Sequence, residues 1–331
     1  MSYVYGPVPS RRLGQSLGVD PIPFKTCNYN CVYCQLGRTT PLTNKRQDFF
    51  PPEDILAEVE TVLSGDRSNQ IDYITFVGQG EPLLCASLGW LIREVKALTD
   101  IPVAVITNGS LLYLSAVRQA LDPADVVMPS LDAADEKTFR RLNRPWPRLH
   151  VARIIEGMVT FREMFKGQLW VEIMLVKGLN DTEEALANIA TILERIQPDQ
   201  VHLNVPIRPP AEGWVEPPEN VDLVRALAIL WKAAPIELPA EGTLRLAQDL
   251  PRVDAIIEII RRHPMQEAKL VETLRRFEQC PDRVQATLEA LAASGQACRH
   301  LYRGQVFWEY TGGRFALVAQ ANTIQKVNYE R

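Results

Sequence analysis

Short apolar runs and amphipathic stretches alternate through the first two thirds of the chain. The runs are rich in β-branched and aromatic residues, which predicts strands, and the stretches repeat apolar residues every three to four positions, which predicts helices. We expect strands at residues 17–24, 73–77, 103–106, 125–128, 170–176 and 200–204. We expect helices at residues 53–63, 88–98, 136–142 and 151–164, one that opens at Ser110, and one capped by Asp181 with Glu184 as its capping-box partner.

Strands that alternate with helices form parallel βαβ units. Right-handed crossovers curl such a sheet into a barrel or part of one, and a flat doubly wound sheet carries the same pattern. Periodicity therefore leaves both folds open. In a parallel barrel, the loops that follow the C-terminal strand ends build the active site.

The pattern changes near residue 264. Helices are expected at residues 267–279 and 282–294, the second closed by Gly295, and strands at 297–302 and 305–310. Helix, helix and hairpin is the order of the last part of a winged-helix module. We therefore expect two domains, an α/β domain over residues 1–263 and a small winged-helix-like domain over residues 264–331.

The charge is unevenly distributed along the 331 residues, whose formal net charge is −4. Residues 1–50 carry six basic and two acidic side chains, whereas residues 51–263 carry 21 basic and 31 acidic ones. An acidic middle argues against broad nonspecific binding of nucleic acid, which needs clustered cations. A specific nucleic-acid substrate at the basic N-terminal stretch remains open.

No apolar run approaches the ~18 residues of a membrane helix. The first residues also lack the basic and then apolar order of a secretion signal. We therefore expect a cytoplasmic protein without membrane contact.

Three of the six cysteines lie close together, with the spacing Cys27-x3-Cys31-x2-Cys34. Three thiolates this close can hold one metal centre. A structural zinc site takes four ligands, and the nearest histidine in sequence is His150. An iron–sulfur cube held by three cysteines keeps one iron open for another ligand. The spacing therefore indicates one metal centre, which could be zinc or an iron–sulfur cluster.

The run from Cys27 to Cys34, with Tyr33 before the third cysteine, resembles the radical S-adenosylmethionine (SAM) superfamily. The resemblance implies that the three cysteines hold a [4Fe-4S] cluster whose fourth iron is chelated by SAM. It also implies reductive cleavage of SAM to methionine and a 5′-deoxyadenosyl radical that abstracts a substrate hydrogen. An external electron donor such as flavodoxin or ferredoxin would supply the electron.

Several expected strands end in residues that suit a nucleotide-like ligand. Gly78-Gln79-Gly80-Glu81-Pro82 is similar to the superfamily's Gly-Gly-Glu motif, which holds the amino group of SAM, although Gln79 interrupts the glycine pair. Ser130 and Asp132 carry a hydroxyl and a carboxylate that could bond a ribose. Taken singly, each segment is also an ordinary turn. The expected SAM-binding residues are Tyr33, Gly78, Gly80, Glu81, Asn108, Ser130, Asp132 and Val205.

These segments would all face one mouth of a barrel, because each follows a parallel strand. That convergence, and the resemblance over about residues 10–210, favour an α/β fold with a partial (β/α)6 TIM-like barrel. Residues 6–20 and 171–181 look like the Fe–S oxidoreductases related to the tRNA wyosine-base synthases. The sequence lacks the second cysteine triad of those synthases, so we expect the subgroup without the wyosine reaction.

The other chemistry-bearing residues have two interpretations each. Cys85, Cys280 and Cys298 fit small buried hydrophobes, yet a lone cysteine such as Cys298 or Cys85 would suit a methyl carrier. Glu172 could face the barrel and move protons, or face a helix and pair with a Lys or Arg. Arg12 could bind a substrate phosphate or carboxylate, or be solvated. Glu172 and Cys298 are thus the catalytic candidates.

The main hypothesis is a radical SAM enzyme with one cluster and an unidentified substrate. The first alternative is a radical SAM methyltransferase that acts on RNA or a small molecule, which the glycine turn at residues 78–82 also resembles. The second is a non-catalytic Fe–S sensor with a winged-helix output. The nearly balanced charge of residues 264–331 favours a lid or a protein-docking module over a duplex binder.

Overall fold

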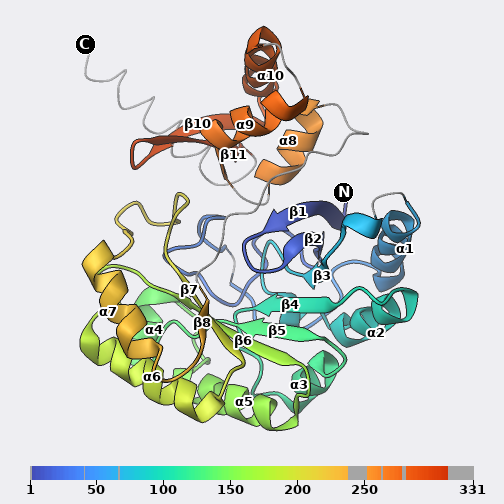
Figure 1. Ribbon diagram of the computed structural model, residues 1–331. Helices are drawn as coiled ribbons and strands as arrows, with labels where there is room; N and C mark the ends of the chain where they lie inside the picture. The colour runs from blue at the N-terminus through green and yellow to red at the C-terminus, as the bar shows by residue number, and fades with distance from the viewer. Residues whose placement is uncertain are drawn as a thin grey trace. The chain divides into compact units, whose positions relative to one another are not determined.

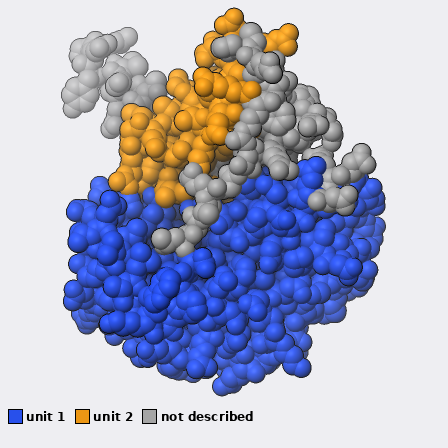
Figure 2. Space-filling model, viewed as in Figure 1, with its two compact units in different colours: residues 1–33, 39–206, 214–243 blue, residues 34–38, 207–213, 244–331 orange. Residues whose placement is uncertain are grey.

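The computed structural model describes residues 2–40, 42–65, 68–237, 252–261, 264–277 and 281–311. The chain divides into two compact units, coloured separately in Figure 2. The first, which we call the barrel unit, comprises residues 1–33, 39–206 and 214–243. The second, the C-terminal unit, comprises residues 34–38, 207–213 and 244–331. Cys280 lies outside the described residues.

The barrel unit contains an eight-stranded sheet whose strands follow one another in sequence order. They are β1 (Val4–Ser10), β2 (Gly14–Val19), β3 (Tyr73–Phe76), β4 (Val103–Thr107), β5 (Val126–Pro129), β6 (Gln168–Met174), β7 (Gln200–Asn204) and β8 (Ile236–Glu237). Only the β1–β2 pair is antiparallel. A doubly wound sheet reverses its strand order at a switch point, and this sheet does not. The expected α/β partial barrel is therefore confirmed.

Helices cover the outer face of this curved sheet (Figure 1). They are α1 (Pro52–Leu63), α2 (Leu88–Leu98), α3 (Ser115–Leu121), α4 (Glu136–Leu142), α5 (Val151–Met164), α6 (Glu183–Ile196) and α7 (Asn220–Leu230), with short 3-10 turns η1 (Ser68–Gln70) and η2 (Pro82–Leu84). Their apolar stripes and the outward residues of the strands form one large core, which includes Ile92, Val105, Ile155 and Val171. Among the described helices, none has both the length and the apolar content that a bilayer crossing requires.

Successive residues of β6 point to opposite faces of the sheet. Leu169, Val171 and Ile173 belong to the large core beneath the helices. Trp170 instead packs in a smaller cluster with Leu13 of the β1–β2 turn and with Ala104, Val126 and Met128. Glu172 and Met174 have the same parity as Trp170, so they face the interior of the barrel.

Two sequence-based boundaries change at the start of the barrel. Residues 17–24 do not form one strand: β2 ends at Val19, ahead of Pro21 and Pro23, which lack the N–H that a strand ladder uses. The helix expected from Ser110 begins at Ser115, because the Ser110 hydroxyl accepts a hydrogen bond from the Asn28 amide instead of capping a helix.

Two further boundaries change around β6 and α6. The strand expected at residues 170–176 spans Gln168–Met174. The N-cap of α6 is Thr182, whose hydroxyl accepts from the Ala185 N–H at 3.2 Å. Asp181 instead accepts from the Gly178 N–H at 2.8 Å, so its carboxylate closes the preceding turn.

The C-terminal unit carries α8 (Arg252–Ile260), β9 (Met265–Gln266), α9 (Glu267–Phe277), α10 (Pro281–Ala293), β10 (Ala297–Tyr302) and β11 (Gln305–Tyr310). Its described strands form a sheet in the order β10-β11-β9. The expected hairpin is present with both strands at the expected residues, and Arg303 and Gly304 form its turn with positive φ angles. A winged-helix relationship for this unit stays a prediction.

Candidate active site

Residues 20–34, which we call the cysteine loop, follow the C-terminal end of β2. They carry three half-buried thiols, none of them in a disulfide. Three N–H groups contact sulfur atoms of this loop. The Tyr29 backbone N–H lies 3.4 Å from Cys27 Sγ, and Asn108 Nδ2 lies 3.8 Å from the same atom. Asn143 Nδ2 lies 3.6 Å from Cys31 Sγ. Hydrogen bonds to sulfur are one of the means by which proteins set the properties of iron–sulfur centres.

Asn28 anchors the cysteine loop to the turn after β4. Its side chain is fully buried and donates to Ser110 Oγ and to Asn44 Oδ1, both at 2.8 Å. It also accepts from Asn108 Nδ2 at 2.8 Å. The sequence analysis missed Asn28 and Asn44, although asparagine is a residue whose side chain often fixes turns.

Gly80 lies directly against the backbone of the cysteine loop. A Cβ atom at this position would come within 1.9 Å of the Thr26 carbonyl oxygen. That carbonyl accepts from the Glu81 N–H at 2.9 Å, and the Lys25 N–H donates to the Gln79 carbonyl at 2.7 Å. The small residue at position 80 therefore makes room for the loop itself, whereas the sequence suggested that the turn gives a ligand close access.

Glu81 ties the end of β3 to the end of β4. The side chain is 1 % exposed and accepts from the Leu83 N–H at 2.9 Å, the Thr107 hydroxyl at 2.5 Å and the Asn108 N–H at 2.7 Å. Burial raises the pKa of Glu81 to about 7, against the opposing effect of these hydrogen bonds. These hydrogen bonds hold the carboxylate against the turn that carries Asn108.

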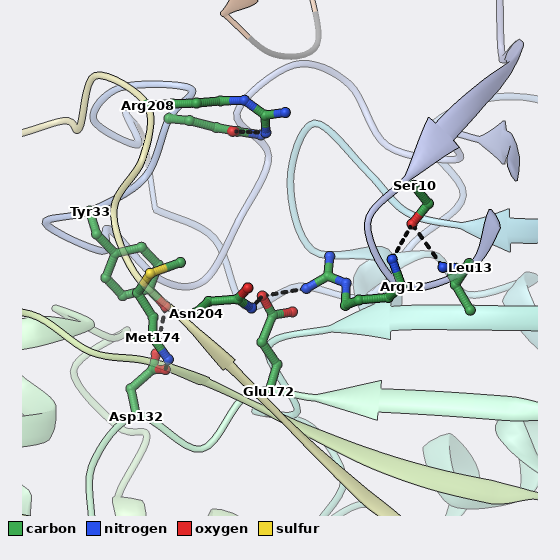
Figure 3. A network of polar contacts seen from close by, with 10 residues as sticks. Ser10, Arg12, Leu13, Tyr33, Asp132, Glu172, Met174, Asn204 and Arg208 are labelled. Atoms are coloured by element: carbon green, nitrogen blue, oxygen red, sulfur yellow. Dashed lines mark hydrogen bonds and ion pairs between the residues drawn. The ribbon is translucent and has the colours of Figure 1, made fainter. Parts of the chain in front are cut away.

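Asp132 links the cysteine loop to the ends of β5 and β6. The Tyr33 hydroxyl donates to Oδ2 at 2.5 Å and Asn143 Nδ2 donates to the same oxygen at 2.7 Å, while the Met174 N–H donates to Oδ1 at 2.9 Å. Figure 3 shows Tyr33 directed at this carboxylate. Burial raises the pKa of Asp132 to about 6 and also raises the pKa of Tyr33. Sequence reasoning found Asp132 and Tyr33 but missed Asn143.

The remaining expected SAM-binding residues lie along the same edge of the sheet. Gly78 follows β3, and a Cβ there would lie 3.3 Å from Asp20 Oδ1. Ser130 follows β5, where its N–H donates to the Thr107 carbonyl at 3.1 Å. Val205 follows β7 and is half-buried. The carboxyl ends of parallel strands thus bring these positions to the edge that also carries Asn108 and the cysteine loop.

Glu172 shares one feature with each of its two interpretations, since it faces the barrel and also pairs with an arginine. It faces the barrel interior, and Arg12 Nη1 lies 2.5 Å from its Oε1 atom (Figure 3). The Asn204 amide donates to the same oxygen. The cation comes from the β1–β2 turn and not from a helix, and the Arg12 side chain is only 16 % exposed. Arg12 is therefore neither solvated nor an uncompensated cation.

Cys85 is buried and Cys298 is half-buried. Burial, helped by the charge of Asp48, raises the pKa of Cys85 to about 12. Cys298 lies in β10 opposite Glu309 of β11, and burial raises its pKa as well. Both side chains therefore remain thiols near neutral pH, which suits packing better than nucleophilic attack.

The residues of the cysteine loop fit a [4Fe-4S] cluster by their donor set, because three reduced thiols come from one short loop and N–H groups are directed at the sulfurs of Cys27 and Cys31. Within the described ranges, no three His, Cys, Asp or Glu side chains gather closely enough to share one metal ion. A [4Fe-4S] cluster does not require three side chains around one metal ion, since each of its thiolates binds a different iron.

A family model described as the Radical SAM superfamily matches residues 22–190, about half of the chain. A UPF0026 protein of Methanocaldococcus jannaschii is 38 % identical over 315 residues, which cover 93 % of this chain and 96 % of that protein. A UPF0026 protein of Helicobacter pylori strain J99 is 34 % identical over 273 residues, which cover 81 % of this chain and 87 % of that protein.

Among solved structures, the chain is similar to TYW1 with a lysine-pyruvate adduct bound. The TM-score is 0.51 at 17 % identity, over 71 % of this chain and 76 % of that one. This likeness concerns the fold alone. The family model shows that the chain belongs to the radical SAM superfamily and is an enzyme whose cofactors are a [4Fe-4S] cluster and S-adenosylmethionine.

Proposed function

We propose that this enzyme holds its cluster with Cys27, Cys31 and Cys34 and acts on its substrate by hydrogen abstraction. The observation that carries the proposal is the pair of asparagine amides directed at cysteine sulfurs: Asn108, held by the buried Asn28, faces Cys27, and Asn143 faces Cys31. When bound, the cluster and SAM supply a 5′-deoxyadenosyl radical, as is general in the superfamily. The chain's own contribution is to hold the thiols in place and to direct N–H groups at two of their sulfurs.

The residues along the strand ends divide into two roles in this proposal. Glu81 and Asp132 act as positioning residues, because the chain's own donors occupy their carboxylate oxygens. Gly78, Ser130 and Val205 line the edge at which SAM binds. Tyr33 and Asn108 connect the cysteine loop to these carboxylates. Tyr33 lies in the loop and donates to Asp132, and Asn108 contacts Cys27 and donates to Glu81.

The alternatives are less well supported. A methyl-carrying cysteine needs a reactive thiolate, and burial raises the pKa of both Cys85 and Cys298. Membership in a superfamily of enzymes removes the reason for a non-catalytic sensor. Radical SAM enzymes require an external electron donor, and we propose a flavodoxin or a ferredoxin for this one. We further propose a winged-helix-like C-terminal unit and a cytoplasmic location.

The test uses full-length protein that is purified and reconstituted without oxygen. We expect about four irons per chain and 5′-deoxyadenosine after reduction with dithionite in the presence of SAM. Cys31→Ala should lose the cluster and the product, because two thiolates cannot hold the cube. The control Cys85→Ser should keep both. Stoichiometric zinc without sulfide, or equal product from Cys31→Ala and the parent, would refute the proposal.

A further inference from the structure

A group of polar side chains lies inside the barrel, away from the cysteine loop. We call Arg12, Trp170, Glu172, His202 and Asn204 the floor cluster. Glu172 pairs in register with His202, and Met174 pairs with Asn204, so these side chains share the inner face of β6 and β7. His202 is 4 % exposed and Asn204 is 2 % exposed. The rings of Trp170 and His202 lie 5.3 Å apart, which joins the cluster across the two strands.

Several polar atoms of the floor cluster have no hydrogen-bond partner within the part of the chain that the structure describes. They are Arg12 Nε, Trp170 Nε1, Asn204 Oδ1 and both ring nitrogens of His202. Leaving such an atom unpaired is unfavourable because its desolvation is not compensated, and native proteins contain few of them. Their concentration on one inner surface indicates a ligand that pairs with them.

The charge of the floor cluster determines what kind of ligand suits it. The Arg12 guanidinium already faces the Glu172 carboxylate. His202 is neutral near pH 7, because burial and the neighbouring Arg12 lower its pKa to about 4. A buried anion or cation would therefore find no uncompensated partner, which is costly. Arg12 Nε and Trp170 Nε1 can donate hydrogen bonds, Asn204 Oδ1 can accept one, and a neutral imidazole does both.

The floor cluster lies close to the strand ends at which we place SAM. The Met174 N–H binds Asp132, and Glu172 precedes Met174 by two residues, or about 7 Å along the strand. The Arg12 and Glu172 side chains keep 16 % and 15 % of their surface exposed, so these two members of the cluster reach solvent. Figure 3 shows Arg12, Glu172 and Asn204 side by side and Asp132 near Met174.

We propose that the floor cluster binds the substrate of this enzyme through a neutral carboxamide-type edge, in which a carbonyl oxygen lies beside an N–H group. Asn204 Oδ1 accepts from the N–H of the substrate, and Arg12 Nε donates to its carbonyl. The neutral imidazole of His202 forms a further hydrogen bond, either as a donor to the substrate carbonyl or as an acceptor from its N–H. The proposal rests on the proposed function, because it takes the barrel interior as the substrate site. Both a simple amide and the lactam edge of a nucleobase carry this chemistry.

Ligand-observed NMR on the reconstituted, SAM-loaded full-length enzyme tests the proposal with three probes: nicotinamide, uracil and nicotinate. We expect nicotinamide or uracil to bind at least tenfold more tightly than nicotinate, which replaces the amide by an anion. Preference for nicotinamide would point to a simple amide and preference for uracil to a nucleobase, and either supports the proposal. Tighter binding of nicotinate than of both neutral probes would overturn it.

Two variants separate recognition from structure. His202→Phe removes two unpaired buried nitrogens, so it should leave the unfolding midpoint unchanged or raise it while weakening the preferred neutral probe about tenfold. Asn204→Leu should weaken that probe similarly. Thr75→Ser is the control, because it keeps the hydroxyl that is bonded to Ser16 on the same sheet. Unchanged probe affinity in both variants would show that the cluster is structural only.

The failure of this proposal can be distinguished from failure of the proposed function. The control Thr75→Ser should still form 5′-deoxyadenosine without substrate and bind the probe as the parent does, because Thr75 lies outside the floor cluster and outside the cysteine loop. Normal 5′-deoxyadenosine with no probe binding to the parent enzyme refutes the floor proposal alone. Absence of 5′-deoxyadenosine from the parent enzyme refutes the proposed function.

Discussion

At the scale of single residues, the Asp132 carboxylate ties the cysteine loop to the ends of β5 and β6. It receives the Tyr33 hydroxyl, the Asn143 amide and the Met174 N–H. Asp132→Asn places an NH2 group among these donors and removes charged hydrogen bonds of about 1.5–3 kcal/mol each. We expect at least tenfold faster loss of the cluster absorbance under air, measured at a fixed protein concentration.

Tyr33→Phe is the matched comparison, since it removes one of the three hydrogen bonds and should give a smaller effect. A direct ribose contact would give a different result. In that case Asp132→Asn would raise the SAM concentration needed for half-maximal cleavage and leave the cluster as stable as in the parent. That result would assign Asp132 to SAM and not to the loop.

Gly80 offers a steric test at the same scale. Gly80→Ala places a Cβ atom 1.9 Å from the Thr26 carbonyl, so the backbone of the cysteine loop must shift. We expect less than half of the parent's iron content after reconstitution. Gly213→Ala is the control, because a Cβ there meets no atom within 4 Å. Full iron content in Gly80→Ala with weaker SAM binding would mean that the residue faces the ligand.

At the scale of elements, β10 and β11 enclose a carboxyl group that lacks a hydrogen-bond partner among the described residues. Glu309 is 2 % exposed, and burial raises its pKa from 4.5 to about 7. Below pH 4.5 the group is protonated in both the folded and unfolded states and costs nothing. Between pH 4.5 and 7 the unfolded state ionises first, so stability falls as pH rises, by on the order of 2–3 kcal/mol.

Glu309→Gln should therefore slow hydrogen exchange of the β10–β11 amides at pH 8 and change it little at pH 5, after correction for the intrinsic rate. The exposed Glu289→Gln serves as control and should change exchange at neither pH. Equal protection by Glu309→Gln at both pH values would contradict the titration and indicate a packing effect.

How far sequence predicts an element depends on how local its determinants are. The β10–β11 hairpin follows from alternating residues around Arg303-Gly304, both of which adopt positive φ. β1 was not among the expected strands, although residues 6–20 also fit a Pro- and Gly-rich lead-in strand, and Pro7 and Pro9 suit an edge strand. It forms because it is the edge strand of its sheet, which the sequence does not reveal. Likewise, Ser110 matches a helix cap locally, but the distant Asn28 takes its hydroxyl.

At the scale of the whole molecule, the order of strands left a barrel and a doubly wound sheet open, and the convergence of strand-end residues together with the family resemblance favoured the partial barrel that the structure shows. The partners of the site residues were not predictable in the same way. Asn143 meets Asp132, and Arg12 meets Glu172, only because the chain brings separate segments together. Which residues face the interior depends on the curvature of the complete sheet, so the floor cluster could not be found from periodicity.

The Arg12–Glu172 pair connects the N-terminal hairpin to the centre of the barrel and gives a prediction at this scale. Arg12→Gln leaves the carboxylate of Glu172 without its cation, and Glu172→Gln leaves the guanidinium without its anion. Because both side chains are about five-sixths buried, each single change should lower the free energy of unfolding of the barrel by about 3 kcal/mol. Urea denaturation followed by tryptophan fluorescence measures it.

The double variant Arg12→Gln/Glu172→Gln decides whether the loss comes from the ion pair. Two amides of similar size can hydrogen-bond to each other, and neither leaves a buried charge unpaired. We therefore expect the double variant to be more stable than either single variant, with a coupling of at least 1 kcal/mol. Additive losses would mean that Arg12 and Glu172 act independently. The hairpin would then be held by Leu13 and its apolar neighbours, and the ion pair would serve the barrel interior without stabilising the fold.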